Sequence, residues 1–265
     1  MSNTLVEGYH ALSTTGGLVE WPELRTHTLS GADVTSWLNG QCTNLVSAEA
    51  TVPVKACLVK PTGQLLSMLD ITLEPAQVRI VEEGPNCLQS RFDTYVVMED
   101  VELVSTETSA WAFARLGDDH FLQREPASSE DLEGWLPVIP WGSIELASLL
   151  HGFPLFRDTN AKTLPHEMGA EFLNNRVSFK KGCYVGQEVL HRIESQGHVN
   201  QYWRVLQTSN EPLAGSEIWS GEKKVGSIIR SSKSSSGTYL SCAFLRNFES
   251  TTVTVGGQVA TLPPS

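Results

Sequence analysis

The sequence lacks any long hydrophobic run. Its uninterrupted apolar stretches are far shorter than the roughly 20 residues that a membrane-spanning helix needs. The opening residues, MSNTLVEGYHALSTTGG, mix polar and apolar side chains, and they form neither the apolar core of a signal peptide nor an Arg-rich transit segment. We therefore expect a cytoplasmic protein without membrane contact.

Cysteine is scarce, and its spacing forms no pairs. The 265 residues contain five cysteines, at positions 42, 57, 87, 183 and 242, and no Cys-x-x-C motif. This argues against a disulfide framework and against a self-contained zinc or iron–sulfur site. Four of them lie in apolar segments, where a small buried side chain is the simplest interpretation. Cys183 differs because polar and glycine residues surround it.

Positive charge is also limited. Lys and Arg number 19 against 30 Asp and Glu, which gives a net charge of −11. Proteins bind nucleic-acid backbones mainly through Lys and Arg, so we expect no broad nucleic-acid surface here. A small local basic site stays open.

Short strands and helices interleave along the first 200 residues without βαβ regularity. Strand patterns occur at 24–29, 51–59, 65–73, 78–83, 95–104, 111–116 and 120–124. Helical patterns occur at 30–40, 86–92, 128–136, 143–150 and 186–195. In the first of these helices, Ser30 is the expected N-cap, Val34, Trp37 and Leu38 share one face, and Gly40 is the expected end.

From residue 201 the pattern changes to short strands separated by polar turns, with 231–237 as an expected exposed loop. Such a segment is typical of a small β-barrel or sandwich. The sequence therefore predicts an α+β protein with a body over 1–200 and a C-terminal β-barrel over 201–265.

The stretch FKKGCYVGQE, residues 179–188, places Cys183 between two lysines and an expected helix start. A neighbouring ammonium, above all that of Lys181, and a helix N-terminus both stabilise a thiolate. The alternative is that the glycines form a turn and the thiol packs inside it. A dyad with His191 or His198 has little support from spacing alone.

The sequence supports a metal site even less than a catalytic dyad. Such a site would combine Cys183 with His166, His191 or Glu188, but no ligand-pair spacing supports it.

Several motifs resemble one family. KKGCYVGQE, followed by Arg192 and Gly197, resembles the signature of the YgfZ-type folate-binding proteins, which are related to the glycine-cleavage T-protein. Further similarity lies in LSGADVTSWLNGQCTN (29–44), KPTGQLL (60–66), GFP (152–154) and LPHE (164–167). The resemblance covers the chain from about residue 20 to its end.

The resemblance implies a ring of α/β subdomains around a central hole that holds a reduced folate such as tetrahydrofolate, followed by a small β-barrel. It implies an accessory protein that supports assembly or repair of iron–sulfur enzymes and tRNA modification, with Cys183 and Lys181 at its functional centre. We expect a monomer that partners iron–sulfur enzymes rather than a conventional enzyme. The residues expected to bind the folate are Gln41, Asn44, Trp141, Glu167, Tyr184, Gln187, Glu188 and Arg192.

Two departures from the family pattern count against folate binding. Leu150 stands where relatives carry a glutamate, whose carboxylate pairs with the N–H groups of a pterin. Gln196, Asn200 and Gln201 replace three cations that suit the glutamate tail of a folate or another polyanion. Leu45 also replaces an acidic residue.

Two other functions stay open. A folate-dependent methyl- or aminomethyltransferase needs an acidic pair, but Ser67 and Met68 occupy its place and Asp70 lies two positions on. A non-enzymatic binding or scaffold protein that has lost folate agrees with Leu150. The alternative for Glu188 and Arg192 is a purely structural role, as an ion pair on the surface of a helix.

Overall fold

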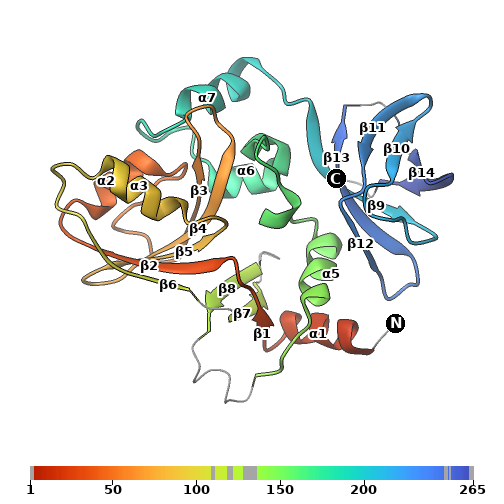
Figure 1. Cartoon of the computed structure of the whole chain (residues 1–265), viewed down its shortest axis with the longest axis horizontal. Helices are drawn as coiled ribbons and strands as arrows, with labels where there is room; N and C mark the ends of the chain where they lie inside the picture. The colour runs from red at the N-terminus through yellow and green to blue at the C-terminus, as the bar shows by residue number, and fades with distance from the viewer. Residues whose placement is uncertain are drawn as a thin grey trace.

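The chain folds into antiparallel sheets flanked by short helices (Figure 1). The computed structural model describes residues 3–108, 111–117, 122–127, 136–247, 250 and 252–262. The helices are α1 (Asn3–Ser13), α2 (Val34–Gln41), α3 (Cys87–Tyr95), α5 (Trp141–His151), α6 (Ala170–Arg176) and α7 (Gln187–Gln196), with 3-10 turns η1 (Phe156–Asp158) and η2 (Pro165–Met168). None of these helices is both long enough and apolar enough to cross a bilayer.

A five-stranded sheet forms one end of the molecule, in the order β3-β4-β5-β2-β6. Its strands are β2 (Leu24–Ser30), β3 (Val54–Val59), β4 (Leu65–Leu73), β5 (Val78–Glu83) and β6 (Glu102–Thr108). Helices α2 and α3 cover one face, and their apolar residues share a core with the sheet that includes Trp37, Leu38, Ile71 and Ile80. The predicted hairpin of 51–59 and 65–73 is confirmed, because β3 pairs with β4.

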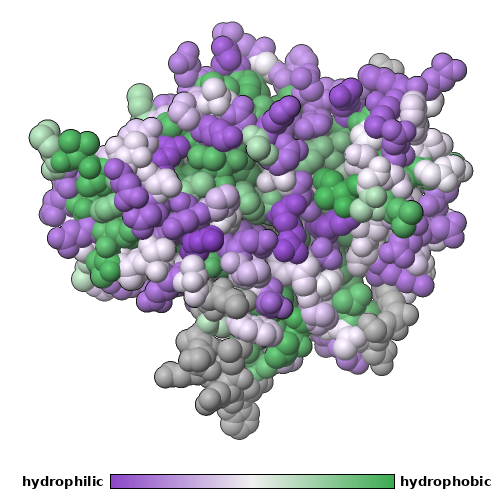
Figure 2. All heavy atoms as spheres, in the orientation of Figure 1, coloured by the Kyte–Doolittle hydropathy of each residue, from purple (hydrophilic) through white to green (hydrophobic). Residues whose placement is uncertain are grey.

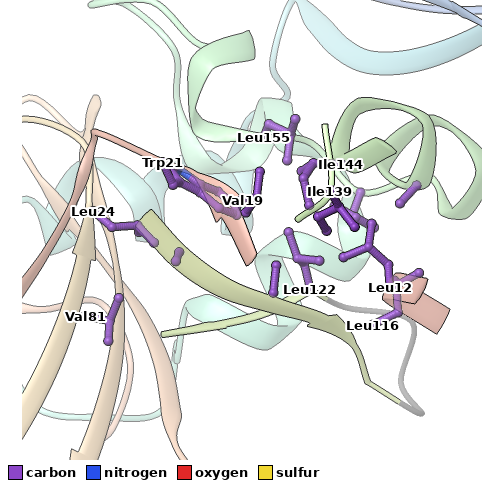
Figure 3. Packing of buried hydrophobic residues seen from close by; sticks show 14 residues of the cluster. Leu12, Val19, Trp21, Leu24, Val81, Leu116, Leu122, Ile139, Ile144 and Leu155 are labelled. Atoms are coloured by element: carbon purple, nitrogen blue, oxygen red, sulfur yellow. The ribbon is translucent and has the colours of Figure 1, made fainter. Parts of the chain in front are cut away.

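A second core lies where α1 and α5 meet a three-stranded sheet in the order β1-β7-β8. The strands are β1 (Gly17–Glu20), β7 (Trp111–Leu116) and β8 (Leu122–Pro126). Figure 3 shows this core, in which Trp21, Leu12 and Ile144 are fully buried. The helix α1 was not predicted from the sequence.

The residues from Gln201 onward form a sheet in the order β11-β10-β14-β15-β9-β13-β12. Its strands are β9 (Gln201–Thr208), β10 (Glu217–Ser220), β11 (Lys223–Ser227), β12 (Arg230–Lys233), β13 (Tyr239–Arg246), β14 (Thr252–Val255) and β15 (Gln258–Thr261). We call this unit the barrel and the preceding residues the body. The sequence division at 200 coincides with the start of β9, although a division into separate folding domains stays a prediction.

A buried ion pair joins the barrel to the body. The guanidinium of Arg230 contacts Asp158 through Nε at 2.7 Å and through Nη2 at 3.0 Å. It also donates to the Glu145 carbonyl and the Ser148 hydroxyl on α5, and the Trp203 indole donates to Asp158. Helix α5 is therefore the helix of the body that packs against β12 and β13 of the barrel (Figure 1).

Three predicted boundaries were wrong. Ser30 ends β2 and pairs with Glu102, and α2 begins only at Val34 and continues through Gly40. The strand expected at 95–104 begins at Glu102, because Tyr95 ends α3 and the apolar residues Val97 and Met98 are exposed. The loop expected at 231–237 starts as β12, which pairs with β13.

The helix expected at 128–136 falls almost entirely outside the described residues.

Candidate functional site

The loop that carries Cys183 is seated on the C-terminal end of α2. The Val185 amide donates to the Gly40 carbonyl at 3.2 Å, and the Ser178 amide donates to the Thr43 carbonyl at 2.9 Å. The two longest motifs of the sequence, 29–44 and 179–188, are therefore neighbours in space. We call residues 177–186 the cysteine loop.

Lys181 ties the cysteine loop to the segment after α2. Its buried ammonium donates to the carbonyls of Cys42 at 2.9 Å and Asn44 at 2.8 Å, and it lies over the Tyr184 ring. Burial lowers the pKa of this ammonium. In the described part of the chain Lys181 makes no hydrogen bond to Cys183, so its predicted role in activating the thiol stays a prediction.

The hairpin turn between β3 and β4 supports the same loop from another side. Gly186 has a φ of +86°, and a Cβ at this position would lie 2.5 Å from the Lys60 carbonyl oxygen. Gly63, in the turn, faces Val189 of α7. A third sequence motif, 60–66, thus packs against the cysteine loop, and only glycine allows this close approach with a left-handed backbone.

Cys183 is exposed, whereas Cys42, Cys57 and Cys242 are buried and Cys87 is partly buried. Burial raises the pKa of the Cys57 and Cys242 thiols to about 12 and that of Cys87 to about 11. It raises the pKa of Cys42 as well. The alternative in which Cys183 packs inside its turn is therefore wrong, and the other four thiols are poorly suited to react.

Helix α7 begins beyond the thiol. Its first residue is Gln187 and its N-cap is Gly186, so Cys183 lies three positions before the cap. The effect of a helix dipole falls off within the first turn, which makes the helix a weaker contributor to thiolate stability than the sequence suggested.

Two expected ligand residues, Gln41 and Tyr184, present unpaired polar atoms. Gln41 Oε1 and Tyr184 Oη are buried and have no hydrogen-bond partner among the described residues. Burial also raises the pKa of the Tyr184 phenol. A buried polar atom without a partner costs about 1–3 kcal/mol, so a bound polar group at either atom recovers energy.

Asn44 is engaged with the main chain. Its side-chain amide donates to the carbonyls of Lys55 and Asn175, and its Oδ1 accepts from the Leu45 amide. These bonds favour the turn-forming alternative for Asn44 that the sequence left open.

The residues expected on α7 lie along its exposed side. Gln187 contacts His191 at 3.1 Å, and Glu188 and Arg192 are exposed. No ion pair joins Glu188 to Arg192 in the described structure, and neither His191 nor His166 bonds to Cys183. The described residues contain no group of His, Cys, Asp and Glu arranged to hold a metal ion.

Trp141 and Glu167 belong to elements outside the cysteine loop, α5 and η2. Trp141 is the first residue of α5 and packs edge-on against Trp21, with 4.8 Å between the ring centres. The Arg157 guanidinium carbon lies over the Trp141 ring, 4.1 Å from its centre. Glu167 lies on η2, where it accepts the Leu164 amide at 2.9 Å, and burial raises the pKa of its carboxyl. The ten expected site residues therefore do not gather around one point.

A small central cavity lies between β3, β4, β5, β8, the 153–155 segment and α6. Its charged lining residues are Lys55, Glu83, Arg124 and Arg176, and Asp70 pairs with both arginines. Asp70 Oδ1 lies 3.1 Å from Arg176 Nη2, and Arg124 Nη2 lies 3.6 Å from Asp70 Oδ2 and 3.0 Å from Glu83 Oε2. The remaining volume is about 20 Å³.

These charges balance one another. Burial would raise the pKa of Asp70, but the Arg124 and Arg176 guanidiniums outweigh it and hold that pKa below its ordinary value. Burial raises the pKa of Glu83 despite the nearby Arg124. Sequence reasoning missed this cluster, because its members come from four distant segments.

Comparison with known proteins identifies relatives of the chain. No protein-family model matches it. The tRNA-modifying protein YgfZ of Yersinia enterocolitica is 33% identical over 196 residues, which cover 71% of this chain and 57% of the relative. The chain is a homologue of the YgfZ proteins. YgfZ of Photorhabdus laumondii is 27% identical over 165 residues, which cover 57% of this chain and 49% of that protein.

The resemblance found in the motifs is thus confirmed, and the matches span about half the length of these YgfZ relatives. A crystal structure of the glycine cleavage system aminomethyltransferase T from Bartonella henselae shares the fold, with a TM-score of 0.73 over 98% of this chain and 88% of that one. Its sequence is 12% identical. The predicted α+β class with a T-protein-like arrangement is confirmed.

The central cavity of this YgfZ homologue does not fit the folate that the resemblance implies. A volume of about 20 Å³ accommodates about one water molecule. Its one lining carboxylate, that of Glu83, is paired with the Arg124 guanidinium. Leu150, at the family's glutamate position, is 43% exposed and does not line this cavity.

Proposed function

We propose that this YgfZ homologue is an accessory protein for tRNA modification, the process named in its relatives, and that Cys183 acts there in the upkeep of iron–sulfur enzymes. The observation that supports this is the accessible Cys183 on a loop held by two other sequence motifs, 29–44 and 60–66. An exposed thiol on a fixed loop can approach a partner protein. We propose that it works in the cytoplasm, as a monomer, on iron–sulfur enzymes as partners.

The chemistry follows from the thiol. As a thiolate, Cys183 is both a nucleophile and a soft ligand for iron. Lys181 fixes the loop through the Cys42 and Asn44 carbonyls, so the thiol is presented without collapse of the loop onto the body. Gln41 and Tyr184 supply unpaired polar atoms for a bound group.

The function test is replacement of the resident YgfZ gene in a bacterium by this chain, followed by mass spectrometry of thiolated nucleosides in tRNA. We expect the wild-type chain to support thiolation, Cys183→Ser to abolish that support, and Cys87→Ser, at a partly buried cysteine, to retain it. Equal thiolation with Cys183→Ser and the wild type, at equal protein levels, would refute the role of the thiol.

Folate binding is tested separately, by calorimetric titration with tetrahydrofolate under reducing conditions. We expect no saturable binding by the wild type at micromolar concentration, because the central cavity is closed by its own ion pairs. Leu150→Glu restores the family's carboxylate at an exposed position. We expect no binding by this variant either, because position 150 lies outside the cavity. Saturable binding by the wild type would contradict a closed cavity.

The aminomethyltransferase alternative gains no support from the site. Ser67 and Met68 are buried in β4, and the nearby Asp70 is paired with Arg124 and Arg176. A carboxylate held by two guanidiniums is a poor base, because its charge is already stabilised.

A further inference from the structure

A second hollow lies between the body and the barrel, away from the cysteine loop. Two adjoining recesses of about 590 Å³ and 550 Å³ share Gln201 and Arg246. The segment 157–160 and Glu167 form one wall, and the ends of β11 and β13 form the other. We call the combined space the barrel cleft. Figure 2 shows hydrophilic side chains gathered where the barrel meets the body.

The barrel cleft concentrates positive charge in an acidic protein. Arg157, Lys223, Lys224 and Arg246 line it, although the whole chain carries a net charge of −11. Arg157 pairs with Glu23 at 3.2 Å and Lys224 pairs with Glu217 at 2.6 Å, both at the surface. Lys223 and Arg246 have no ion-pair partner within the described ranges. Two cations are therefore available to a ligand.

The two acidic residues of the barrel cleft are already engaged. Asp158 is directed into the Arg230 guanidinium and the Trp203 indole. Glu167 accepts the Leu164 amide, and burial raises the pKa of its carboxyl. The four cations that line the barrel cleft therefore outnumber its two carboxylates, and Asp158 is already neutralised by Arg230.

The remaining lining suits a small organic molecule. Asn160, Asn200, Gln201 and Asn247 offer amide donors and acceptors, and Phe244 contributes an apolar surface. Each recess falls within the usual range of ligand pockets, about 300–1,000 Å³. Cations, amides and one aromatic face together match an anion with an organic part. Guanidinium and ammonium groups are the usual partners of phosphate.

We infer that the barrel cleft is a binding site for a phosphate-bearing small molecule of about nucleotide size, held through Arg246 and Lys223. This inference does not depend on the role of Cys183, because the contacts of the two sites involve different residues.

The test is calorimetric titration of the full chain with three probes: adenosine diphosphate, inorganic pyrophosphate and citrate. We expect saturable binding of adenosine diphosphate, and about tenfold weaker binding by Arg246→Gln and by Lys223→Gln, the loss typical of one hydrogen bond to a charged group. Lys233→Gln removes a cation from β12, outside the barrel cleft, and should bind as the wild type does. Circular dichroism and melting temperature confirm that each variant is folded.

Two kinds of result would overturn the inference. Binding of citrate without either phosphate probe would overturn the phosphate assignment. Binding of no probe at millimolar concentration, or equal affinity in Arg246→Gln, Lys223→Gln and the wild type, would overturn the site itself. Because Cys183→Ser leaves the barrel cleft intact, it should bind adenosine diphosphate normally, which separates this inference from the proposed function.

Discussion

The ion pair between Arg230 and Asp158 predicts how strongly the barrel is attached to the body. The Asp158 side chain is fully buried and that of Arg230 is 11% exposed, so solvent screens this pair little. Arg230→Met keeps much of the side-chain volume but leaves the Asp158 carboxylate with only the Trp203 indole and the Leu155 amide as donors. Removal of one partner from a buried ion pair costs about 3–5 kcal/mol.

The structure gives this estimate additional support. Arg230 also donates to the Glu145 carbonyl and the Ser148 hydroxyl, which lose a partner in the variant. For a chain of this size, 1 kcal/mol corresponds to about 2–4 °C in melting temperature. Arg230→Met should therefore lower the melting temperature by about 6–20 °C.

The assay is urea and thermal unfolding followed by tryptophan fluorescence, because Trp203 bonds directly to Asp158. Arg204→Met is the matched control, since it removes an exposed arginine of β9 whose guanidinium lies 5.6 Å from the centre of the Tyr202 ring. It should change stability by less than about 0.5 kcal/mol. A loss below about 1 kcal/mol in Arg230→Met would refute the view that this pair holds the barrel to the body.

Three further predictions concern the cysteine loop and its surroundings. Ellman's reagent should modify one thiol per native chain rapidly, and Cys183→Ser should abolish this fast phase; rapid modification of a second thiol would contradict the burial of the others. Burial lowers the pKa of His166, so the unfolded chain takes up this proton first, and stability should fall as the pH drops below about 6.5. Urea midpoints from pH 5 to 8 should show a smaller fall in His166→Gln, and parallel curves would count against this origin. Gly186→Ala should lower the free energy of unfolding in urea by about 1–3 kcal/mol, because Gly186 has a positive φ and a short main-chain contact. Gly182→Ala, with open space around it, should lower it less. Equal losses in the two variants would show that the contact is unimportant.

Local sequence pattern predicted the helices in which the spacing of apolar residues and the capping residues indicate the same bounds. Helix α5 combines an apolar run with Gly152 at its end, and Gly152 adopts the left-handed conformation that ends a helix. Helix α2 buries Val34, Trp37 and Leu38 as their spacing predicted. Its start was misplaced because Ser30 takes part in the pairing of β2 and β6, and this tertiary contact outweighs its tendency to cap a helix.

Sequence could not predict the direction of individual side chains. Lys181 is close to Cys183 in sequence, yet its ammonium reaches back to carbonyls about 140 residues away along the chain. The central charge cluster and the barrel cleft were missed for a related reason. Each brings together residues from distant segments, and no local spacing connects Asp70 to Arg124 or Arg157 to Arg246.

The divergence of this chain from the family pattern is consistent with a shift of charge between elements. Asn200 and Gln201, at positions where the motif resemblance predicts cations, both line the barrel cleft. The positive charge there comes instead from Lys223 and Arg246 on the barrel. The proposed anion site therefore relies on these two residues rather than on positions 200 and 201. The barrel cleft, with recesses of about 590 Å³ and 550 Å³, is therefore far larger than the central cavity of about 20 Å³.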